Sequence, residues 1–264
     1  MNKITALSNP LVKEIKSLHS RKGRDKAGLF IIEGLKLVND AIKAGLPVRL
    51  IAYNESCPVD YIHQNVDIEQ YIFSDEVMKK VSTTDSPVSI IAVARKPETK
   101  KDILPAICQK SSLVVILDNI SDPGNLGTII RTCCGAGIDA LLLAGDSVDL
   151  YNPKVIRSSA GLAWKMQVIK VKDKQQLVDQ LKSSKFRIIV ADAKAEYCYY
   201  DRVYGQKAAI VFGSESHGVS DIFIQAADPA VKIPISQDVE SLNVAISAAI
   251  ILFEARRQKD TKDE

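Results

Sequence analysis

The chain has 264 residues, 46% of them hydrophobic and 25% charged, which is ordinary globular composition and supplies enough apolar surface for one or two packed domains. Its 35 Lys and Arg residues against 32 Asp and Glu residues give a formal net charge of +3, which excludes a uniformly basic nucleic-acid coat but not a local basic patch. The five cysteines are widely spread without a C-x-x-C pair, so neither a disulfide framework nor a zinc site is expected.

The compartment is predicted from two further features. The first ten residues lack the apolar stretch of a signal peptide, and no apolar run approaches the roughly 18 residues of a membrane span. Scattered free cysteines fit a reducing compartment. We therefore expect a cytoplasmic protein that does not enter a membrane.

Positive charge is concentrated at the start of the chain, where residues 1–26 hold seven basic residues and two acidic ones. Apolar residues recur at helical spacing after Asn9 and Pro10, and proline is favoured in the first turn of a helix. The lysines fall on the opposite face. The pattern predicts an amphipathic helix that packs one side and offers the other to phosphate groups, with a merely solvated basic face as the alternative.

The residues that follow alternate between strand and helix patterns, which predicts a first α/β domain over residues 1–96. We expect strands at residues 29–32, 48–53, 71–73 and 89–94, and helices at residues 34–44 and 75–81. Apolar periodicity then lapses in a polar stretch that contains Pro97, so residues 97–110 are predicted to be a linker.

Residues 111–264 repeat the alternation more strongly and are predicted to form a second domain. Apolar runs predict strands at residues 113–117, 140–143, 166–171, 187–190, 208–212 and 231–235. Continuous runs of this kind suit a parallel sheet covered on both faces, so we expect an α/β fold with a doubly wound second domain. The last helix, predicted over residues 242–257, is apolar nearly all round and is suited to burial by the sheet and by a second subunit.

Doubly wound domains bind ligands in loops beyond the carboxyl ends of their strands, and the first such loop reads D-N-I-S-D-P-G-N-L-G-T-I-I-R over residues 118–131. Asp-Pro-Gly is a turn signal, Asn125 is placed to cap the next helix, and Arg131 falls in the second turn of that helix. The alternative is a purely structural role, in which Asn125 only caps the helix and Arg131 only forms an ion pair. The flanking glycines, however, let a phosphate or another chain approach closely. No G-x-G-x-x-G or Walker pattern is present, which disfavours a dinucleotide or P-loop site.

The second loop reads F-G-S-E-S-H-G over residues 212–218. Gly213 allows close backbone approach to a ligand, and Glu215 lies in the loop before the next helix, where a solvated acid is the alternative interpretation. His217 is interpreted as a surface histidine rather than as a base.

The third loop reads I-P-I-S-Q-D-V-E-S-L-N-V over residues 233–244, where Pro234 argues for the end of a strand. Ser241 and Asn243 place two hydrogen-bonding side chains at the start of the apolar last helix. A capping role explains Ser241, but it explains Asn243 less well if that residue lies one turn into the helix, because Asn is a mediocre helix former.

Together, in this order and near these spacings, the three loops resemble the motifs of the SpoU/TrmH family of RNA ribose 2′-O-methyltransferases within the SPOUT superfamily. The resemblance covers about residues 111–258, and the first hundred residues resemble more weakly the family's ribosomal-protein-like RNA-binding extension. It implies a C-terminal α/β methyltransferase domain with a mostly parallel sheet threaded into a trefoil knot, and a smaller N-terminal α/β RNA-binding domain. Periodicity does not predict a knot, because knots are nearly absent from proteins.

The resemblance implies S-adenosyl-L-methionine as the cofactor and requires no metal. By position, the cofactor-binding residues are Gly213, Ile233 and Leu242, with residues 190–193 beside the same pocket. By the same analogy, the catalytic set is Asn125, Arg131, Glu215, Ser241 and Asn243.

Arg131 is the residue to which the family analogy gives the role of base or activator of the 2′-hydroxyl. An arginine with a pKa above about 12 is almost never neutral in a protein. We therefore expect Arg131 to hold the adjacent phosphate and to stabilise developing alkoxide charge, while the other polar residues of the set orient the arginine, the nucleotide and the second loop.

The resemblance also implies RNA as the partner, with rRNA favoured over tRNA, and a homodimer formed through the knotted region. The basic start is then expected to contact RNA phosphates through Lys13, Lys16, Arg21, Lys22 and Arg24. The alternatives are a tRNA ribose methyltransferase, a base or small-molecule methyltransferase of the superfamily, and a non-catalytic RNA-binding protein of the same fold. The polar set in the three loops argues against the last, because a scaffold does not need it.

Overall fold

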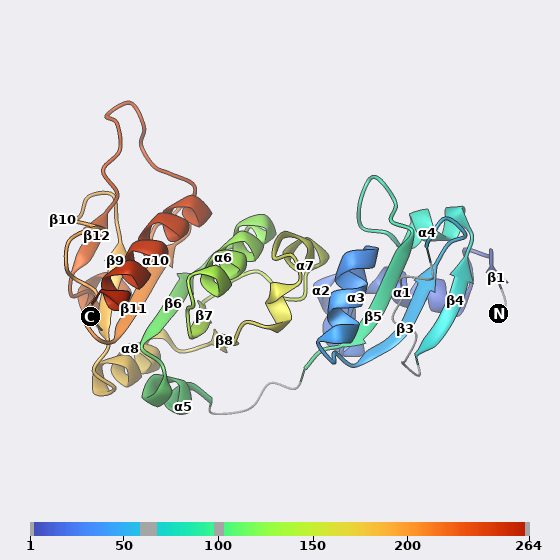
Figure 1. Ribbon diagram of the computed structural model, residues 1–264, viewed down its shortest axis with the longest axis horizontal. Coiled ribbons are helices and arrows are strands. Elements are labelled where there is room, and N and C mark those ends of the chain that lie inside the picture. Colours follow the sequence, from blue (N-terminus) through green and yellow to red (C-terminus); the bar gives the residue numbers. More distant parts are fainter. Residues whose placement is uncertain (1–2, 59–67, 98–102, 262–264) are drawn as a thin grey trace. The chain divides into compact units, whose positions relative to one another are not determined.

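The computed structural model describes residues 3–58, 68–97 and 103–261, and the chain divides into two compact units (Figure 1). Unit 1 comprises Met1–Thr99 together with Asp149–Gly161, and unit 2 comprises Lys100–Val148 together with Leu162–Glu264. Unit 1 therefore takes up a segment that lies, in the sequence, between two strands of unit 2. In the described part of the chain, no helix has the length and apolar character needed to cross a membrane.

Unit 1 is a mixed five-stranded sheet with helices. In sheet order, its strands are β1 (Lys3–Ile4), β4 (Glu69–Phe73), β3 (Val48–Tyr53), β5 (Ile90–Arg95) and β2 (Leu29–Glu33). Neighbours pair in parallel from β1 to β3, whereas β5 runs antiparallel to both β3 and β2. The helices are α1 (Pro10–Ser17), α2 (Arg21–Ala27), α3 (Leu35–Lys43), α4 (Asp75–Val81) and α7 (Pro153–Ser158).

The first helix forms where the sequence predicts it. The Asn9 side chain accepts a hydrogen bond from the Leu11 backbone and Pro10 occupies the first turn, so the start of α1 is both capped and preorganised. Val12 and Ile15 are buried in a core cluster with residues of β3 and α4. The opposite face of α1 carries exposed Lys13 and Lys16, as the amphipathic pattern predicts.

Arg24 is the one member of the predicted phosphate-contacting set that the structure contradicts. Its side chain is 2% exposed, and its Nε lies 2.8 Å from Oδ2 of Asp149, which is also buried. Its Nη1 donates to the backbone carbonyls of Leu18 and His19. A guanidinium enclosed by internal acceptors does not reach a phosphate, so Arg24 is a structural residue of unit 1.

A second ion pair, of which only the carboxylate is buried, joins segment 149–161 to the strands of unit 1. Arg157 lies 2.5 Å from Oε2 of Glu33, whose side chain is 1% exposed. Glu33 also accepts hydrogen bonds from the Ser82 hydroxyl and the Thr83 backbone. Tyr151 packs its ring 4.9 Å from that of Phe30. Segment 149–161 is thus fixed to unit 1 by two ion pairs and an aromatic contact.

Unit 2 is a seven-stranded sheet in which every described pairing is parallel. In sheet order, its strands are β10 (Tyr197–Cys198), β12 (Ala230–Lys232), β9 (Arg187–Ala191), β11 (Ala208–Gly213), β6 (Leu113–Asp118), β7 (Ala140–Ala144) and β8 (Val168–Val171). Its helices are α5 (Ile103–Lys110), α6 (Pro123–Gly135), α8 (Lys174–Ser183), α9 (Asp221–Ala226) and α10 (Val244–Asp260), with a 3₁₀ helix at Leu162–Trp164. This is the α/β class with a parallel second sheet that the sequence predicts.

The sheet of unit 2 is buried on both faces, which explains its unbroken apolar strands. Val114, Ile116 and Val211 face a core cluster that includes residues of α5, α8 and α9. Alternate residues such as Val115 and Phe212 are equally buried on the other face, where α10 packs against α6 and β11.

Three predicted boundaries in this half change for physical reasons. The strand expected at residues 231–235 ends at Lys232, because Pro234 has no backbone N–H for the ladder. The last helix begins at Val244 rather than at residue 242, because Asn243 caps it. Within the predicted linker, residues 98–102 lie outside the described residues, and residues 103–110 form α5 of unit 2.

The buried pair of Arg24 and Asp149 gives a stability prediction. Asp149→Ala leaves a buried guanidinium without its counter-charge, so we expect unit 1 to lose about 3–5 kcal/mol of unfolding free energy. Urea unfolding measures this, because far-ultraviolet circular dichroism follows both units while fluorescence of the only tryptophan, Trp164, follows unit 2. Glu55→Ala is the control: it removes the exposed pair with Lys3 and should cost less than about 1 kcal/mol. Equal effects of the two substitutions would contradict the prediction.

Candidate active site

The site lies at the carboxyl edge of the unit 2 sheet. The loops that follow β6, β11 and β12 all leave this edge, because parallel strands end on the same side. They are the three loops that the sequence singles out. The structure brings Asn125 from the first, Glu215 from the second and Asn243 from the third into direct contact.

These three side chains form a closed set of hydrogen bonds. Asn125 donates through Nδ2 to Glu215 Oε1 at 3.1 Å. Asn243 donates through Nδ2 to the same carboxylate oxygen at 2.9 Å and to Asn125 Oδ1 at 3.0 Å. Residues up to 118 positions apart in the sequence are thereby tied at one point. We call Asn125, Glu215 and Asn243 the polar triad.

The residues that cap the two helices next to the triad, α6 and α10, differ from those expected from the sequence. Asp122, not Asn125, caps α6, because its side chain accepts from the Asn125 backbone N–H. Arg131 consequently lies in the third turn of α6 rather than in the second. Asn243 does cap α10: its Oδ1 accepts from the backbones of Ala245 and Ile246. The two ends of the Asn243 amide therefore serve two purposes, since Oδ1 caps the helix and Nδ2 binds the triad.

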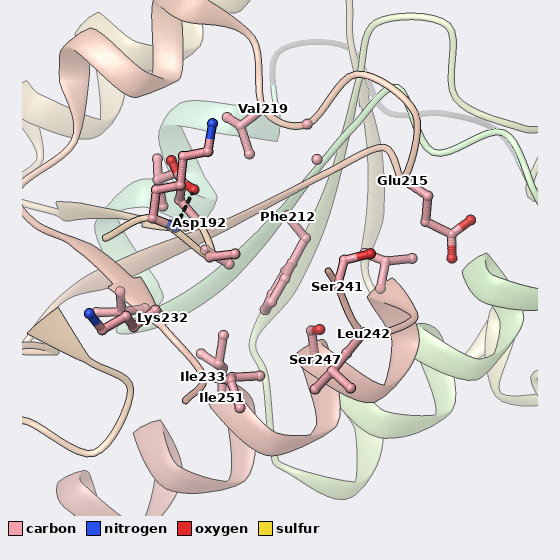
Figure 2. A pocket seen from close by; sticks show the side chains of 18 of the residues that line it. Asp192, Phe212, Glu215, Val219, Lys232, Ile233, Ser241, Leu242, Ser247 and Ile251 are labelled. Atoms are coloured by element: carbon pink, nitrogen blue, oxygen red, sulfur yellow. Dashed lines mark hydrogen bonds between the residues drawn. The ribbon is translucent and has the colours of Figure 1, made fainter. Parts of the chain in front are cut away.

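Beside the triad lies a cavity of about 370 Å³, within the size range of small-molecule sites (Figure 2). It is lined by all three predicted cofactor-binding residues, Gly213, Ile233 and Leu242, and by Glu215 and Ser241. The predicted border at residues 190–193 also lines it. Figure 2 shows the Phe212 ring between Asp192 on one side and Glu215 with Ser241 on the other.

Gly213 is required for a reason other than the one inferred from the sequence. A Cβ on Gly213 would lie 2.1 Å from the carbonyl carbon of Gly218, a distance that backbone atoms cannot accommodate. The loop folds back on itself here, since Ser214 and Gly218 exchange backbone hydrogen bonds. The glycine thus lets the loop close, and the closed loop forms one wall of the cavity.

Several lining residues were not predicted from the sequence. His217, interpreted there as a surface residue, is exposed but lines the cavity, and so do Lys194 and Lys232. Lys194 follows the end of β9 and the predicted border at residues 190–193, so its position after a predicted strand was the signal that could have identified it. The Asp192 carboxylate accepts from the Lys194 backbone at 2.9 Å, which holds that turn.

Arg131 is not brought into the cavity. It is exposed on α6 and is not among the lining residues. Among the residues that the structure describes, none forms a hydrogen bond or an ion pair with its guanidinium. The predicted catalytic set is therefore split: Asn125, Glu215, Ser241 and Asn243 lie at the cavity or its triad, and Arg131 lies outside.

In unit 1, the remaining predicted phosphate-contacting residues, Lys13, Lys16, Arg21 and Lys22, are all exposed. Lys16 donates to the Lys80 carbonyl at 3.3 Å, and Arg21 lies 3.8 Å from Asp25 on the next turn of α2. Glu14, the acidic residue of α1, is paired internally: the Arg49 guanidinium donates two hydrogen bonds to its carboxylate, which balances its charge and lowers its pKa. The exposed face of α1 and α2 is therefore predominantly positive.

The lining fits S-adenosylmethionine in three respects. Phe212, Ile233 and Leu242 supply apolar walls for an aromatic base. The backbone of a closed loop provides donors and acceptors for its polar edges. Carboxylates at Asp192 and Glu215 suit a ligand that carries a sulfonium and an ammonium charge.

Comparison with known proteins gives a family for each half. The SpoU rRNA Methylase family matches residues 112–253, and an MRM3-like substrate binding domain matches residues 9–92. The 23S rRNA (guanosine(2553)-2′-O)-methyltransferase RlmP of Bacillus subtilis is 32% identical over 97% of this chain and 100% of its own length.

Two solved structures show how far the similarity extends. The SpoU methyltransferase AviRb from Streptomyces viridochromogenes, in complex with the cofactor AdoMet, superimposes with a TM-score of 0.85 at 26% identity, covering 96% of this chain and 99% of its own. The A. aeolicus TrmH/SpoU tRNA modifying enzyme matches with a TM-score of 0.52 at 26% identity, covering 61% of this chain and 82% of its own.

The triad predicts that the loops hold one another through Asn243. Asn243→Asp keeps an oxygen to cap α10 but replaces the donating amide with a second carboxylate beside Glu215. A weakening of the loop by about 1 kcal/mol should speed hydrogen exchange of the residue 214–219 amides about fivefold, measured by mass spectrometry. The matched control is Asn152→Asp at the cap of α7, which should leave that exchange unchanged. Unchanged exchange in both variants would show that the triad does not hold the loop.

Proposed function

We infer the reaction from the premise that this chain belongs to the SpoU rRNA Methylase family: it is an S-adenosylmethionine-dependent RNA 2′-O-methyltransferase, and its substrate is ribosomal RNA. The observation that carries this function is the convergence of the three loops on one cavity beside the polar triad. Neither a fold nor a family match alone identifies a working site.

The cavity residues would hold the methyl donor when it is bound. Ile233 and Leu242 would pack against its base, and the backbone at Gly213 would bind its polar edges. The donor supplies a methyl group on a positively charged sulfur. The chain then has to exclude water and to hold the ribose oxygen in line with that group, because correct placement accounts for much of the acceleration of such a displacement.

The polar residues have separate roles in this proposal. The triad fixes the relation of the three loops, and Ser241, exposed at the cavity, orients the nucleotide by a hydrogen bond. Arg131 binds the phosphate next to the target ribose and stabilises the charge that develops on its 2′-oxygen. A permanently charged guanidinium suits that task and does not suit proton removal, so the proton passes to the phosphate or to water.

Ribosomal RNA is favoured over tRNA by the extent of the similarity. RlmP, named for 23S rRNA, and AviRb align with nearly the whole of this chain, whereas the tRNA modifying enzyme aligns with 61% of it. Unit 1 supplies the additional surface. Its exposed positive face on α1 and α2 would contact RNA phosphates through Lys13, Lys16, Arg21 and Lys22, giving affinity that does not depend on sequence.

We also propose that the chain is a homodimer with a knotted second unit. Ile246 and Phe253 are each 53% exposed and lie seven residues apart, hence on one face of α10, and such an apolar face suits contact with a second copy. Support for the knot comes from the path of the chain, which runs out to β12 and returns past the loops of β6 and β11 before α10 packs on α6.

The reaction and the role of Arg131 are tested together. Unmodified ribosomal RNA, incubated with protein and methyl-labelled donor, should gain one linkage that resists alkaline hydrolysis, because a methylated 2′-oxygen cannot attack the phosphate. Arg131→Lys should lower turnover about 10²-fold or more while S-adenosylhomocysteine affinity, measured by calorimetry, stays the same. Arg202→Lys, at an exposed arginine outside the cavity lining, is the matched control.

Each alternative function has its own outcome in this experiment. Label on a base, with hydrolysis unaffected, would indicate base methylation. RNA and donor binding without transfer would indicate a binding protein. Full turnover of Arg131→Lys would remove the proposed role of the guanidinium.

The RNA face of unit 1 predicts a change in salt dependence. Lys13→Glu with Lys22→Glu should weaken RNA binding and reduce the slope of log affinity against log salt by about 0.7–0.9 for each phosphate that the variant no longer neutralises, measured by fluorescence anisotropy. Lys36→Glu with Lys43→Glu makes the same charge change on α3. If the two double variants had equal slopes of log affinity against log salt, RNA would not bind preferentially to the face of α1 and α2.

A further inference from the structure

We propose that Asp118 is a positioning residue for the donor site, and that its carboxylate holds the cavity-lining loop 213–220 closed. The inference rests on the proposed function, since the loop matters because it forms a wall of the donor cavity and carries Glu215. Asp118 itself does not line the cavity. It would act through the loop rather than on the reacting atoms.

Asp118 is a completely buried carboxylate at the end of β6. Its Oδ1 lies 2.6 Å from the Lys174 ammonium and accepts from the Asn119 amide at 3.1 Å. Its Oδ2 accepts from the Ser220 backbone N–H at 2.7 Å and from the Ser220 hydroxyl. An uncompensated buried charge is very costly, so this full set of donors is what makes the site possible.

The same residue meets both ends of loop 213–220. At the start of the loop, Gly213 is the partner of Asp118 in the parallel ladder of β11 and β6. At its end, Ser220 is bound by the Asp118 side chain. Between these ends the chain doubles back through the paired backbones of Ser214 and Gly218. One residue of a rigid central strand therefore fixes where the loop leaves the sheet and where it enters α9.

Lys174, the first residue of α8, completes the arrangement. Its ammonium also donates to the Ser220 hydroxyl at 2.8 Å, so that hydroxyl accepts one hydrogen bond while it donates another to Asp118. The hydroxyl proton is thus directed by the charges on either side of it. We call Asp118, Lys174 and Ser220 the clasp.

The clasp explains how Glu215 can be placed on a loop and still be held accurately. Glu215 is exposed, and among the described residues its carboxylate accepts only from the triad amides of Asn125 and Asn243. Those contacts orient it only if the loop itself stays in place. A displacement of about 1 Å at a reacting centre can cost about 10²-fold in rate, so an anchor beneath the loop has a direct effect on binding and turnover.

Ser220→Ala is the central test, because it removes the hydroxyl while Asp118 keeps its charge partner and the backbone hydrogen bond. We expect S-adenosylhomocysteine to bind more than about tenfold more weakly by calorimetry, and the residue 214–219 amides to exchange faster, with the melting temperature of unit 2 followed through Trp164 little changed. Ser220→Thr restores a hydroxyl and should restore binding. Asp118→Asn, which keeps the shape but removes the charge, should resemble or exceed Ser220→Ala.

The matched control is Ser216→Ala in the same loop. The Ser216 hydroxyl contacts only His217 among the described residues and does not line the cavity, so this variant should bind like the unaltered chain. Wild-type affinity and exchange in both Ser220→Ala and Asp118→Asn would overturn the inference, and so would a fall in melting temperature without a change in affinity of the folded protein. Failure of the unaltered chain to bind S-adenosylhomocysteine would instead refute the proposed function.

Discussion

The site depends on the parallel pairing of β6 with β11 at the centre of the unit 2 sheet. Six residues of each strand pair in register, from Leu113 with Ala208 to Asp118 with Gly213, and those pairs are almost wholly buried. Parallel pairing sends both following loops out of one edge, side by side. The third loop comes from β12, one strand beyond β9. The polar triad is therefore a consequence of strand order more than of any property of its own side chains.

The triad and the clasp divide the work of holding the loops between exposed and buried groups. Asn125, Glu215 and Asn243 meet near the surface, where their amide and carboxylate groups tie the three loops together. Asp118 lies beneath them in full burial, where a missing partner is expensive and the geometry is correspondingly strict.

Much of this architecture follows from local sequence pattern. Strands such as 113–117 and 208–212 are predicted to within one residue, because a parallel sheet covered on both faces imposes continuous apolar runs. The three loops and the residues expected to hold the cofactor were singled out by the motifs of the family resemblance. Their meeting in one cavity required the strand order, which periodicity does not contain.

The features that the sequence did not predict depend on contacts between residues far apart in the chain or on the exact start of a helix. Arg24 carries the same helical and charge signature as the exposed residues Arg21 and Lys22, and its ion pair with the distant Asp149 is not written in that local pattern. Asn243 looked unlike a cap because its helix was predicted to start two residues early. Segment 149–161 has no local signal for membership of unit 1, since its ion pairs with Arg24 and Glu33 span more than 120 residues.

Because segment 149–161 belongs to unit 1, the two units are linked by more than one stretch of polypeptide. The polypeptide crosses between them three times, near residues 99, 148 and 161. A protease that cuts once between the units would therefore not release either as an intact piece, and an exchange of the substrate-binding half with that of a relative would have to transplant two separate stretches of gene. The two segments of unit 1 are separated in the sequence by residues 100–148 of unit 2, so unit 1 is not a simple terminal extension of unit 2.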